Sequence, residues 1–368
     1  MEGFAIFRLP RQSACTLIEG EACPLLSYAE LNGQKGFVVA PFAISPTTPL
    51  VLIRKEKMLT VAVGQIEELQ DTMAVECFDT LYTDAVYGKG HEDGRLSYAI
   101  DFANFHSQLL RSAFQKIVLA RCYSMPNDGG LTPLQLFAKA CRRYPRMFVA
   151  LVSTPLSGTW LTATPEVLLE RTGDQWRTVA LAGTQKLEGQ QLSFDTPLGS
   201  GQLAVDWSAK NIVEHRIVVT YVAECLEQFL ADFREEGPIT VRAANLVHLR
   251  SDFTFTLPDR QHIGDLLQTL HPTPAVCGLP KRDAFRFIMQ NEHTPRLYYS
   301  GFTGALDLSD KEADDTATHL YVTLRCMNIT RSGCHLYAGG GLLPDSDEEQ
   351  EWQETEAKLD TMRQLLKS

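Results

Sequence analysis

The chain has 368 residues and is 44% hydrophobic and 21% charged, a composition typical of a globular protein with a sizeable buried core. Its formal net charge is −11 at pH 7. Proteins that bind nucleic acid or an anionic membrane rely on clustered Lys and Arg side chains. The acidic balance therefore predicts no nucleic-acid partner and no membrane partner.

The cysteines and the first residues indicate a compartment. The nine cysteines are scattered without any C-x-x-C pair, which favours reduced thiols over a disulfide framework or a zinc site. The residues after Met1 show no basic stretch followed by an apolar run, and no run of about 18 apolar residues occurs. We therefore expect a cytoplasmic protein whose cysteines are small core residues.

The first half of the chain predicts strands, one long helix and more strands. Before residue 90, β-like runs at 4–8, 36–40 and 50–54 alternate with turn-forming residues. Apolar residues then recur at helical spacing from Ser97 to about Gln115. The following segments predict a strand at 116–121, a helix at 132–143, strands at 147–153 and 160–163, and a hairpin over 166–182.

The second half predicts more helix, and its pattern ends in strands and a C-terminal helix. We expect a long helix over about 205–233, a strand at 250–257, a helix at 259–270, a Pro/Gly loop at 271–281 and a helix from there to about 291. Strands are expected at 296–304, 319–327 and 333–343. Ser346, with Glu349 three residues later, is typical of a capping box, so we expect a final helix from there to Leu366.

These elements predict an α+β fold. No repeat, low-complexity tract or linker divides the chain, so we expect a single large domain over residues 1–368, with mainly antiparallel sheets flanked by helices. The run Gly339–Gly341 has neither the Gly-Lys-Ser/Thr of a phosphate loop nor the spacing of a dinucleotide fingerprint. The sequence therefore predicts no nucleotide cofactor.

The C-terminal helix carries a group of charged residues on one side. Glu351, Glu354 and Lys358 stand at helical positions i, i+3 and i+7, so they share a face near the preceding glycines. Two carboxylates beside an ammonium suit a Mg²⁺ ion and, through it, a substrate carboxylate. The alternative is that they are solvent-facing charges near a helix N-terminus, where Glu is favourable.

Other candidate residues also have two interpretations. Lys116, Val118 and Ala120 share one strand face, so Lys116 is partly buried if that face is packed, or else it is an edge lysine that discourages aggregation. Lys210 and Glu214 stand one helical turn apart, as in a surface ion pair.

Several motifs together resemble those of chorismate-utilising enzymes, a family that includes isochorismate, salicylate, anthranilate and aminodeoxychorismate synthases. In chain order they are KIVLAR with Lys116, TPEVLL with Glu166, LAGT with Gly183, KNIVEH with Glu214, HPTPAVCGLP from His271, YVTLRC with Arg325, AGGGL from Ala338 and EWQETEAKL from Glu351. The resemblance covers residues 95–368, and it is specific because the motifs occur in register.

The resemblance implies a Mg²⁺ site and a binding site for chorismate, a ring with two carboxylates. It implies that Glu214 and Glu354 bind the metal, with Glu351 as a direct or water-mediated ligand. Hard Mg²⁺ prefers such oxygen ligands. It also implies a set of residues that hold or line the substrate: Gly183, Thr184, Ala275, Arg325, Gly339, Gly341 and Lys358.

Two positions distinguish members of the family, Lys116 and the residue before Gly183, which is Ala182. By resemblance, Lys116 is the general base that activates water for attack at ring carbon C2, and Glu166 is the general acid that protonates the departing C4 hydroxyl. Ala182 stands where aminodeoxychorismate synthases carry a nucleophilic Lys. The resemblance therefore implies a Mg²⁺-dependent isochorismate synthase for menaquinone or siderophore biosynthesis, acting without a glutaminase subunit.

Two alternatives stay open at this point. A salicylate synthase would use the same Lys and Glu and then eliminate pyruvate, and a catalytically silent homologue would bind chorismate or metal without turnover. The chain also departs from the family pattern at Cys277, where Ser is common, and at Gln185, where Arg is frequent. Neither position carries the acid or the base.

Overall fold

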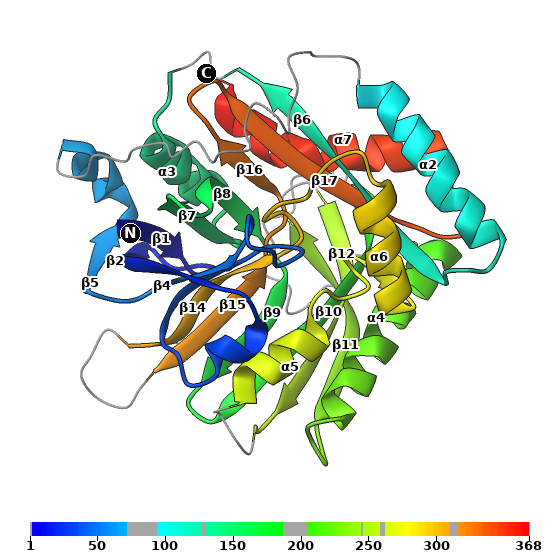
Figure 1. The fold of residues 1–368 in the computed structure, drawn as a ribbon, viewed down its shortest axis with the longest axis horizontal. Helices are drawn as coiled ribbons and strands as arrows, with labels where there is room; N and C mark the ends of the chain where they lie inside the picture. Colours follow the sequence, from blue (N-terminus) through cyan, green and yellow to red (C-terminus); the bar gives the residue numbers. More distant parts are fainter. Residues whose placement is uncertain are drawn as a thin grey trace.

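The fold is built from two antiparallel sheets that share one strand (Figure 1). The computed structural model describes residues 2–71, 94–126, 130–186, 205–243, 246–257, 262–309 and 316–367. The first sheet has the order β5 (Lys57–Ala62), β2 (Ala14–Leu25), β1 (Glu2–Arg8), β7 (Phe148–Thr154), β8 (Gly158–Thr164), β16 (Cys326–Ile329), β17 (Cys334–Leu342), β6 (Lys116–Met125) and β13 (Gly278–Leu279). The second has the order β2, β4 (Leu50–Ile53), β3 (Gly36–Ala40), β14 (Phe302–Leu308), β15 (Ala317–Val322), β9 (Val167–Thr172), β10 (Gln175–Lys186), β12 (Leu246–Phe255) and β11 (Arg234–Ala243). The predicted α+β class with antiparallel sheets is confirmed.

The shared strand β2 was not predicted. Its residues 14–21 pair with β5 and β1 in the first sheet, and its residues 22–25 pair with β4 in the second. Glu19, Gly20 and Pro24 interrupt any apolar alternation along it. Its extended form is therefore set by its partner strands and not by local propensity.

Helices cover the sheets. They are α2 (Gly94–Leu110), α3 (Pro133–Arg143), α4 (Ala209–Glu227), α5 (Ile263–Leu270), α6 (Lys281–Asn291) and α7 (Glu348–Leu366), with two short 3₁₀ segments, η1 (Tyr28–Leu31) and η2 (Val63–Asp71). α3 packs on β7 and β8, α7 on β17, and α4 on β10 and β12 (Figure 1). Among the described helices, none combines the length and apolar character that a membrane span needs.

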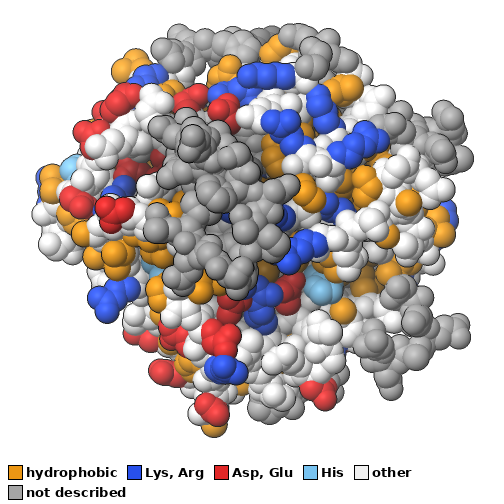
Figure 2. All heavy atoms as spheres, turned by 180° about the vertical axis from the view of Figure 1, so that it is seen from behind, with side chains coloured by type: hydrophobic (Ala, Val, Ile, Leu, Met, Phe, Trp, Pro, Cys, Tyr) orange, Lys and Arg blue, Asp and Glu red, His pale blue; other side chains and the backbone are white. Residues whose placement is uncertain are grey.

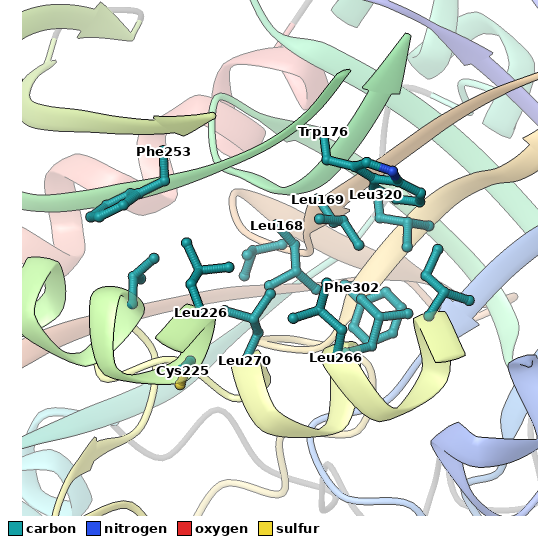
Figure 3. Packing of buried hydrophobic residues seen from close by; sticks show 14 of the residues in the cluster. Leu168, Leu169, Trp176, Cys225, Leu226, Phe253, Leu266, Leu270, Phe302 and Leu320 are labelled. Atoms are coloured by element: carbon teal, nitrogen blue, oxygen red, sulfur yellow. The ribbon is translucent and has the colours of Figure 1, made fainter. Parts of the chain in front are cut away.

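The largest apolar cluster lies beneath α4 and α5 (Figure 3). We call it the helix-covered core, and its labelled members are Leu168, Leu169, Trp176, Cys225, Leu226, Phe253, Leu266, Leu270, Phe302 and Leu320. α4 and α5 are amphipathic here, since their apolar residues recur at helical spacing and face the second sheet. Full burial of one such Leu or Phe contributes roughly 1.5–3 kcal/mol to folding.

Three predicted boundaries were wrong for backbone reasons. Residues 296–301 are not part of the predicted strand at 296–304, because Leu297 and Ser300 have φ values of 50° and 62° and turn the chain before β14 begins at Phe302. The predicted strand over 319–327 is broken because Arg325 has φ 46°. The N-cap of the last helix is Asp347, whose side chain accepts from Gln350 N, and not Ser346.

Two predicted helices were too long. α4 begins at Ala209, after the cap Ser208, and ends at Glu227, so it is shorter than the predicted 205–233. α2 ends at Leu110 and Ser112 has φ 58°, which closes the helix before residue 115. Part of the predicted helix at 259–270 lies outside the described residues, and α5 begins at Ile263.

Surface charge is uneven on the face shown in Figure 2. Lys and Arg side chains gather in its upper right part, whereas Asp and Glu side chains are more frequent at its left and lower edges. The net charge of −11 is therefore an average over regions of opposite sign. In the described residues the cysteines are free thiols, as expected.

Candidate functional site

A cavity lies where β10, β12 and β17 meet the N-terminal part of α4. It contains about 520 Å³ of empty space including its mouth. The predicted site residues that line it are Glu166, Gly183, Thr184, Glu214, Ala275, Arg325, Gly339, Gly341 and Lys358. Because they come from strands, loops and helices far apart in the sequence, the fold alone brings them together.

The remaining predicted residues lie against the glycines of β17. A Cβ built on Gly341 would be 2.3 Å from Glu214 Oε1 and 3.1 Å from Lys116 Nζ. A Cβ built on Gly340 would be 3.1 Å from Glu351 Oε2 and 3.8 Å from Glu354 Oε1. The two faces of this strand thus serve the cavity and α7 in turn, and a side chain on either face would have to displace the carboxylates beside it.

Lys116 and Glu214 form an ion pair at the cavity. Lys116 Nζ lies 2.8 Å from Glu214 Oε1, and the Lys116 side chain is 0% exposed. Burial alone would raise the pKa of Glu214, but the neighbouring Lys116 ammonium and more distant lysines lower it overall. The interpretation of Lys116 as an edge lysine was wrong, and so was the pairing of Glu214 with Lys210.

The two glutamates of α7 are also paired with lysines. Glu351 pairs with Lys210 and accepts from Ser346 Oγ at 2.7 Å. Lys358 Nζ lies 2.5 Å from Glu354 Oε1 and donates to Gly339 O at 2.8 Å. These residues do share one helix face beside the glycines, as the spacing predicted, and the alternative of a fully solvated face was wrong.

The donor chemistry of these carboxylates fits a hard divalent cation. All of the candidate donors are carboxylate oxygens, and Glu351 Oε2 is buried with no hydrogen-bond partner among the described residues. Burial, and then the nearby Glu354, raise the pKa of Glu351. As the described residues stand, no three His, Cys, Asp or Glu groups are arranged to hold a metal. Binding of one ion by Glu214, Glu351 and Glu354 would therefore require these side chains to move closer together.

Glu166 is a buried acid in the cavity wall. It follows Pro165 and directly precedes β9, and it is 4% exposed. Burial raises its pKa to about 7, against the opposing effect of the cations Arg325, Lys116 and Lys358. The group is therefore partly protonated near neutral pH, as a proton donor must be.

Arg325 presents a buried guanidinium to the same cavity. Its positive φ separates β15 from β16 and turns the side chain out of the strand ladder. Burial lowers its pKa, although Tyr299 and Glu166 oppose the effect. Such a planar, desolvated cation suits a carboxylate ligand.

Gly183 lies at a bulge in β10. The pairing of β10 with β12 shifts register between Ala182 and Thr184, and Gly183 has φ 73°. A Cβ there would be 3.0 Å from Asn211 O of α4. Glycine readily adopts the positive φ and leaves space for Asn211 O, whereas a residue with a Cβ would be strained in both respects. The bulge therefore brings the strand backbone and α4 together at the cavity.

Two cavity residues with polar side chains were missed by the sequence reasoning, His248 and Tyr299. His248 Nδ1 lies 3.3 Å from Gly183 O and 3.2 Å from Thr184 Oγ1, and its Nε2 lies 3.5 Å from Arg325 Nη2. Burial lowers the pKa of His248 well below its usual value, so the ring is neutral. The available signal was a histidine among the apolar residues of 246–249, a segment that lay outside the strand predicted at 250–257.

The other two histidines of the motifs have structural contacts. His271 Nδ1 lies 2.8 Å from Tyr28 Oη, and its Nε2 lies 2.9 Å from Ser300 O. His215 Nε2 lies 3.0 Å from Ser251 Oγ. His271 therefore orders the HPTP loop through contacts from both ring nitrogens.

Solved structures share this fold. The "putative 2,3-dihydroxybenzoate-specific isochorismate synthase, DhbC" from Bacillus anthracis aligns with a TM-score of 0.75 and 22% identity, covering 98% of this chain and 95% of that one. "MenF, the Menaquinone-Specific Isochorismate Synthase" from Escherichia coli aligns with a TM-score of 0.74 and 22% identity, covering 99% and 89%.

Curated relatives and a family model give the family. The chain is 34% identical over 272 residues to "Salicylate biosynthesis isochorismate synthase" from Pseudomonas aeruginosa, covering 71% of this chain and 52% of the relative. It is 31% identical over 256 residues to "Isochorismate synthase MenF" from Escherichia coli, covering 68% and 56%. The matches thus span little more than half of these relatives. A family model described as "Chorismate binding enzyme" matches residues 48–367, and the chain therefore belongs to the family of chorismate binding enzymes.

Proposed function

We propose that the protein is an isochorismate synthase, which isomerises chorismate to isochorismate. The observation that carries this proposal is Glu166, a buried carboxyl with a pKa of about 7 in a cavity shared with Arg325 and Lys358. The names of the relatives support the same reaction. Menaquinone or siderophore biosynthesis is the proposed context, and the cytoplasm is the proposed compartment.

The reaction needs an acid and a base at one ring. Lys116 acts as the base only after its ammonium has given up a proton and its ion pair with Glu214; the neutral amine then takes a proton from water as the water oxygen bonds to C2. The ring double bonds shift, the C4–oxygen bond breaks, and Glu166 gives its proton to the departing hydroxyl, which leaves as water. Water is gained and lost once, so the product is an isomer of the substrate. Each of the two proton transfers contributes about 10²–10⁴-fold to the rate.

The cations of the cavity hold the substrate. Arg325 and Lys358 line the wall, and each suits a substrate carboxylate. Ala182 also lines the wall, so this position offers no amine that could attack the ring, and water is the nucleophile that the site favours. Mg²⁺, when bound by Glu214, Glu351 and Glu354, supplies positive charge for an anionic substrate group.

Product analysis tests the proposal. Purified protein is incubated with chorismate and Mg²⁺, and the products are separated by chromatography. Isochorismate without pyruvate supports the proposal, whereas salicylate plus pyruvate indicates a salicylate synthase and no turnover indicates a silent homologue. Chelation of Mg²⁺ is expected to stop turnover, and added Mg²⁺ to restore it; turnover that persists in chelator contradicts the metal proposal.

Substitution of the base gives the matching test. Lys116→Ala should abolish water addition while chorismate still binds, and near-normal turnover would remove Lys116 from the mechanism. Lys57→Ala is the matched control, because Lys57 also pairs with a glutamate at 2.8 Å, Glu19, but its side chain is 59% exposed. The control should keep the kcat of the parent protein.

A further inference from the structure

A fully buried ion pair lies behind the cavity wall and has no part in the proposed chemistry. Arg296 Nε donates to Glu292 Oε2 at 2.6 Å, and Arg296 Nη2 donates to Glu292 Oε1 at 2.7 Å. The two side chains are 2% and 1% exposed. Phe42 covers the guanidinium, with its ring centroid 4.4 Å from the central carbon.

This pair takes the place of a neighbouring strand along β6. The two-residue strand β13 pairs with Lys116 and Ile117, and Val118 N then donates to Cys277 O at 2.7 Å. Beyond that point Val118 O accepts from Arg296 Nη2 at 2.8 Å, and Ala120 N donates to Glu292 Oε1 at 2.7 Å. Two side chains therefore satisfy the backbone of the strand that begins with the proposed base.

Arg296 also connects that strand to the adjoining loop of the wall. Its Nη1 donates to Val276 O at 2.6 Å. Val118 and Val276 both line the cavity, so one planar guanidinium bonds the carbonyls of two wall residues. Tyr299, a third wall residue, donates its backbone N–H to Arg296 O at 2.9 Å.

We propose that Arg296, held by Glu292, is a positioning residue for the isomerisation: it fixes β6 with Lys116 against the loop that carries Ala275 and Val276. This inference rests on the proposed function. Burying an ion pair costs solvation free energy, and apolar residues of similar volume often stabilise a fold equally well. A rigid fork that reaches Val118 O, Val276 O and Glu292 at once is what an apolar side chain or a lysine cannot supply.

Arg296→Lys is the informative variant, because it keeps the positive charge beside Glu292 and loses the fork. Arg8→Lys is the matched control. Arg8 is 2% exposed and donates to the backbone carbonyls of Cys141, Tyr144 and Met147, none of which is a described part of the cavity wall. Both substitutions remove a buried guanidinium that bonds backbone carbonyls. They differ because the carbonyls bonded by Arg296 belong to the cavity wall, whereas those bonded by Arg8 do not belong to its described part.

The measurement is kcat and KM for chorismate per mole of folded protein, with the folded fraction taken from unfolding curves in the presence and absence of a stabilising osmolyte. We expect kcat of Arg296→Lys to fall about 100-fold, as for a base displaced by about 1 Å, while KM changes less than about threefold. Osmolyte should restore folding but not kcat. Arg8→Lys should lose stability and keep kcat.

Three results are decisive. A near-parental kcat for folded Arg296→Lys overturns the inference and leaves the proposed function intact. An equal loss of kcat in Arg8→Lys also overturns it, because any buried arginine would then have the effect. A parent protein without turnover of chorismate overturns the proposed function, and the inference falls with it.

Discussion

The helix-covered core and the cavity are built from the same elements but follow opposite rules. α4 contributes Val218, Val222 and Leu226 to the core, where apolar side chains pack against each other. One turn earlier, the same helix carries Glu214 to the cavity, where it pairs with the buried Lys116, and its Lys210 pairs with Glu351 of α7. Burial of the core side chains therefore stabilises the fold. Burial of the cavity charges costs solvation free energy, and their ion pairs offset only part of this cost.

This difference separates stability from activity. Substitutions in the core should lower the free energy of unfolding and leave the chemistry of the folded protein unchanged. Substitutions in the cavity should lower activity with little loss of stability, or even with a gain, because strained and desolvated groups are removed.

Glu166→Gln should have the largest effect. It removes the proposed acid and keeps the shape, so we expect kcat to fall about 10²–10⁴-fold. Glu170→Gln is the control, since Glu170 lies on β9, pairs with Arg177 and is not a described part of the cavity wall. Steady-state kinetics of both variants give the comparison, and a similar loss in the two would contradict a specific role for Glu166.

The pH dependence of Glu166 follows from its raised pKa. Because the folded-state pKa is about 7 against 4.5 for the free group, the folded protein binds more protons between these values, and stability falls as pH rises from about 4.5 to 7. The loss is on the order of 3 kcal/mol. As an acid, Glu166 also loses its proton above about pH 7, so kcat/KM should decline there.

Unfolding curves at several pH values test this assignment. Glu166→Gln should be more stable than the parent protein at pH 8 and should show a flatter pH profile. The effect of Glu170 on stability has the opposite pH dependence. Burial would raise the pKa of Glu170, but His319, Tyr321 and Arg177 lower it overall. Its contribution to the free energy of unfolding is therefore present at neutral pH and lost in acid. If the stability of Glu166→Gln depended on pH as that of the parent protein does, a group other than Glu166 would be responsible for the change between about pH 4.5 and 7.

Leu266→Ala should have the next largest effect, and on stability alone. Leu266 is 0% exposed in the helix-covered core, and deletion of such a side chain costs about 2–5 kcal/mol. Leu96→Ala is the control, because Leu96 is 69% exposed on α2. Denaturant unfolding should separate the two, while kcat per folded molecule stays at the parental value for both. A large fall in kcat for Leu266→Ala would break the separation of core from cavity.

The sequence predicted which side chains lie together better than it predicted the strand boundaries. The motifs occur in the same order as in the family, and this order predicted that Glu166, Arg325 and Lys358 line one cavity. The residues next to each of them in the sequence do not indicate it. Residue spacing alone predicted the shared face of Glu351 and Glu354, because helix geometry is regular.

The failures have a common physical cause. Leu297, Ser300 and Arg325 adopt positive φ without being glycine, a conformation that surrounding contacts impose and local sequence does not reveal. β2 is extended because it lies between partner strands. His248 was missed because a lone histidine in a strand gives no sign of what faces it across the sheet.

Gly341→Ala should have a smaller, graded effect on activity. Its new Cβ would lie 2.3 Å from Glu214 Oε1, so the Lys116–Glu214 pair must move, and we expect kcat/KM to fall about 10–100-fold. Gly340→Ala faces α7, where the nearest atom is Glu351 Oε2 at 3.1 Å, so its effect should be smaller. Kinetics of the two variants give the ranking, and a reversed order would contradict the assignment of the two faces of β17.

Helix caps give the smallest effects and the sharpest comparison, because the same kind of substitution can be made in both regions. Thr132 caps α3, which packs on the first sheet, and its side chain accepts from Gln135 N in a capping box. Ser208 caps α4, and its side chain accepts from Asn211 N one turn before Glu214. Loss of either cap by substitution with Ala costs about 1 kcal/mol.

The two cap variants should therefore be alike in stability and differ in function. Unfolding curves of Thr132→Ala and Ser208→Ala should shift by similar amounts. Fraying of the first turn of α4 loosens Lys210 and Glu214. Ser208→Ala should therefore raise the Mg²⁺ concentration that gives half-maximal turnover, whereas Thr132→Ala should leave that concentration unchanged. Equal Mg²⁺ titrations in both variants would show that the cavity end of α4 is held by its ion pairs and not by its cap.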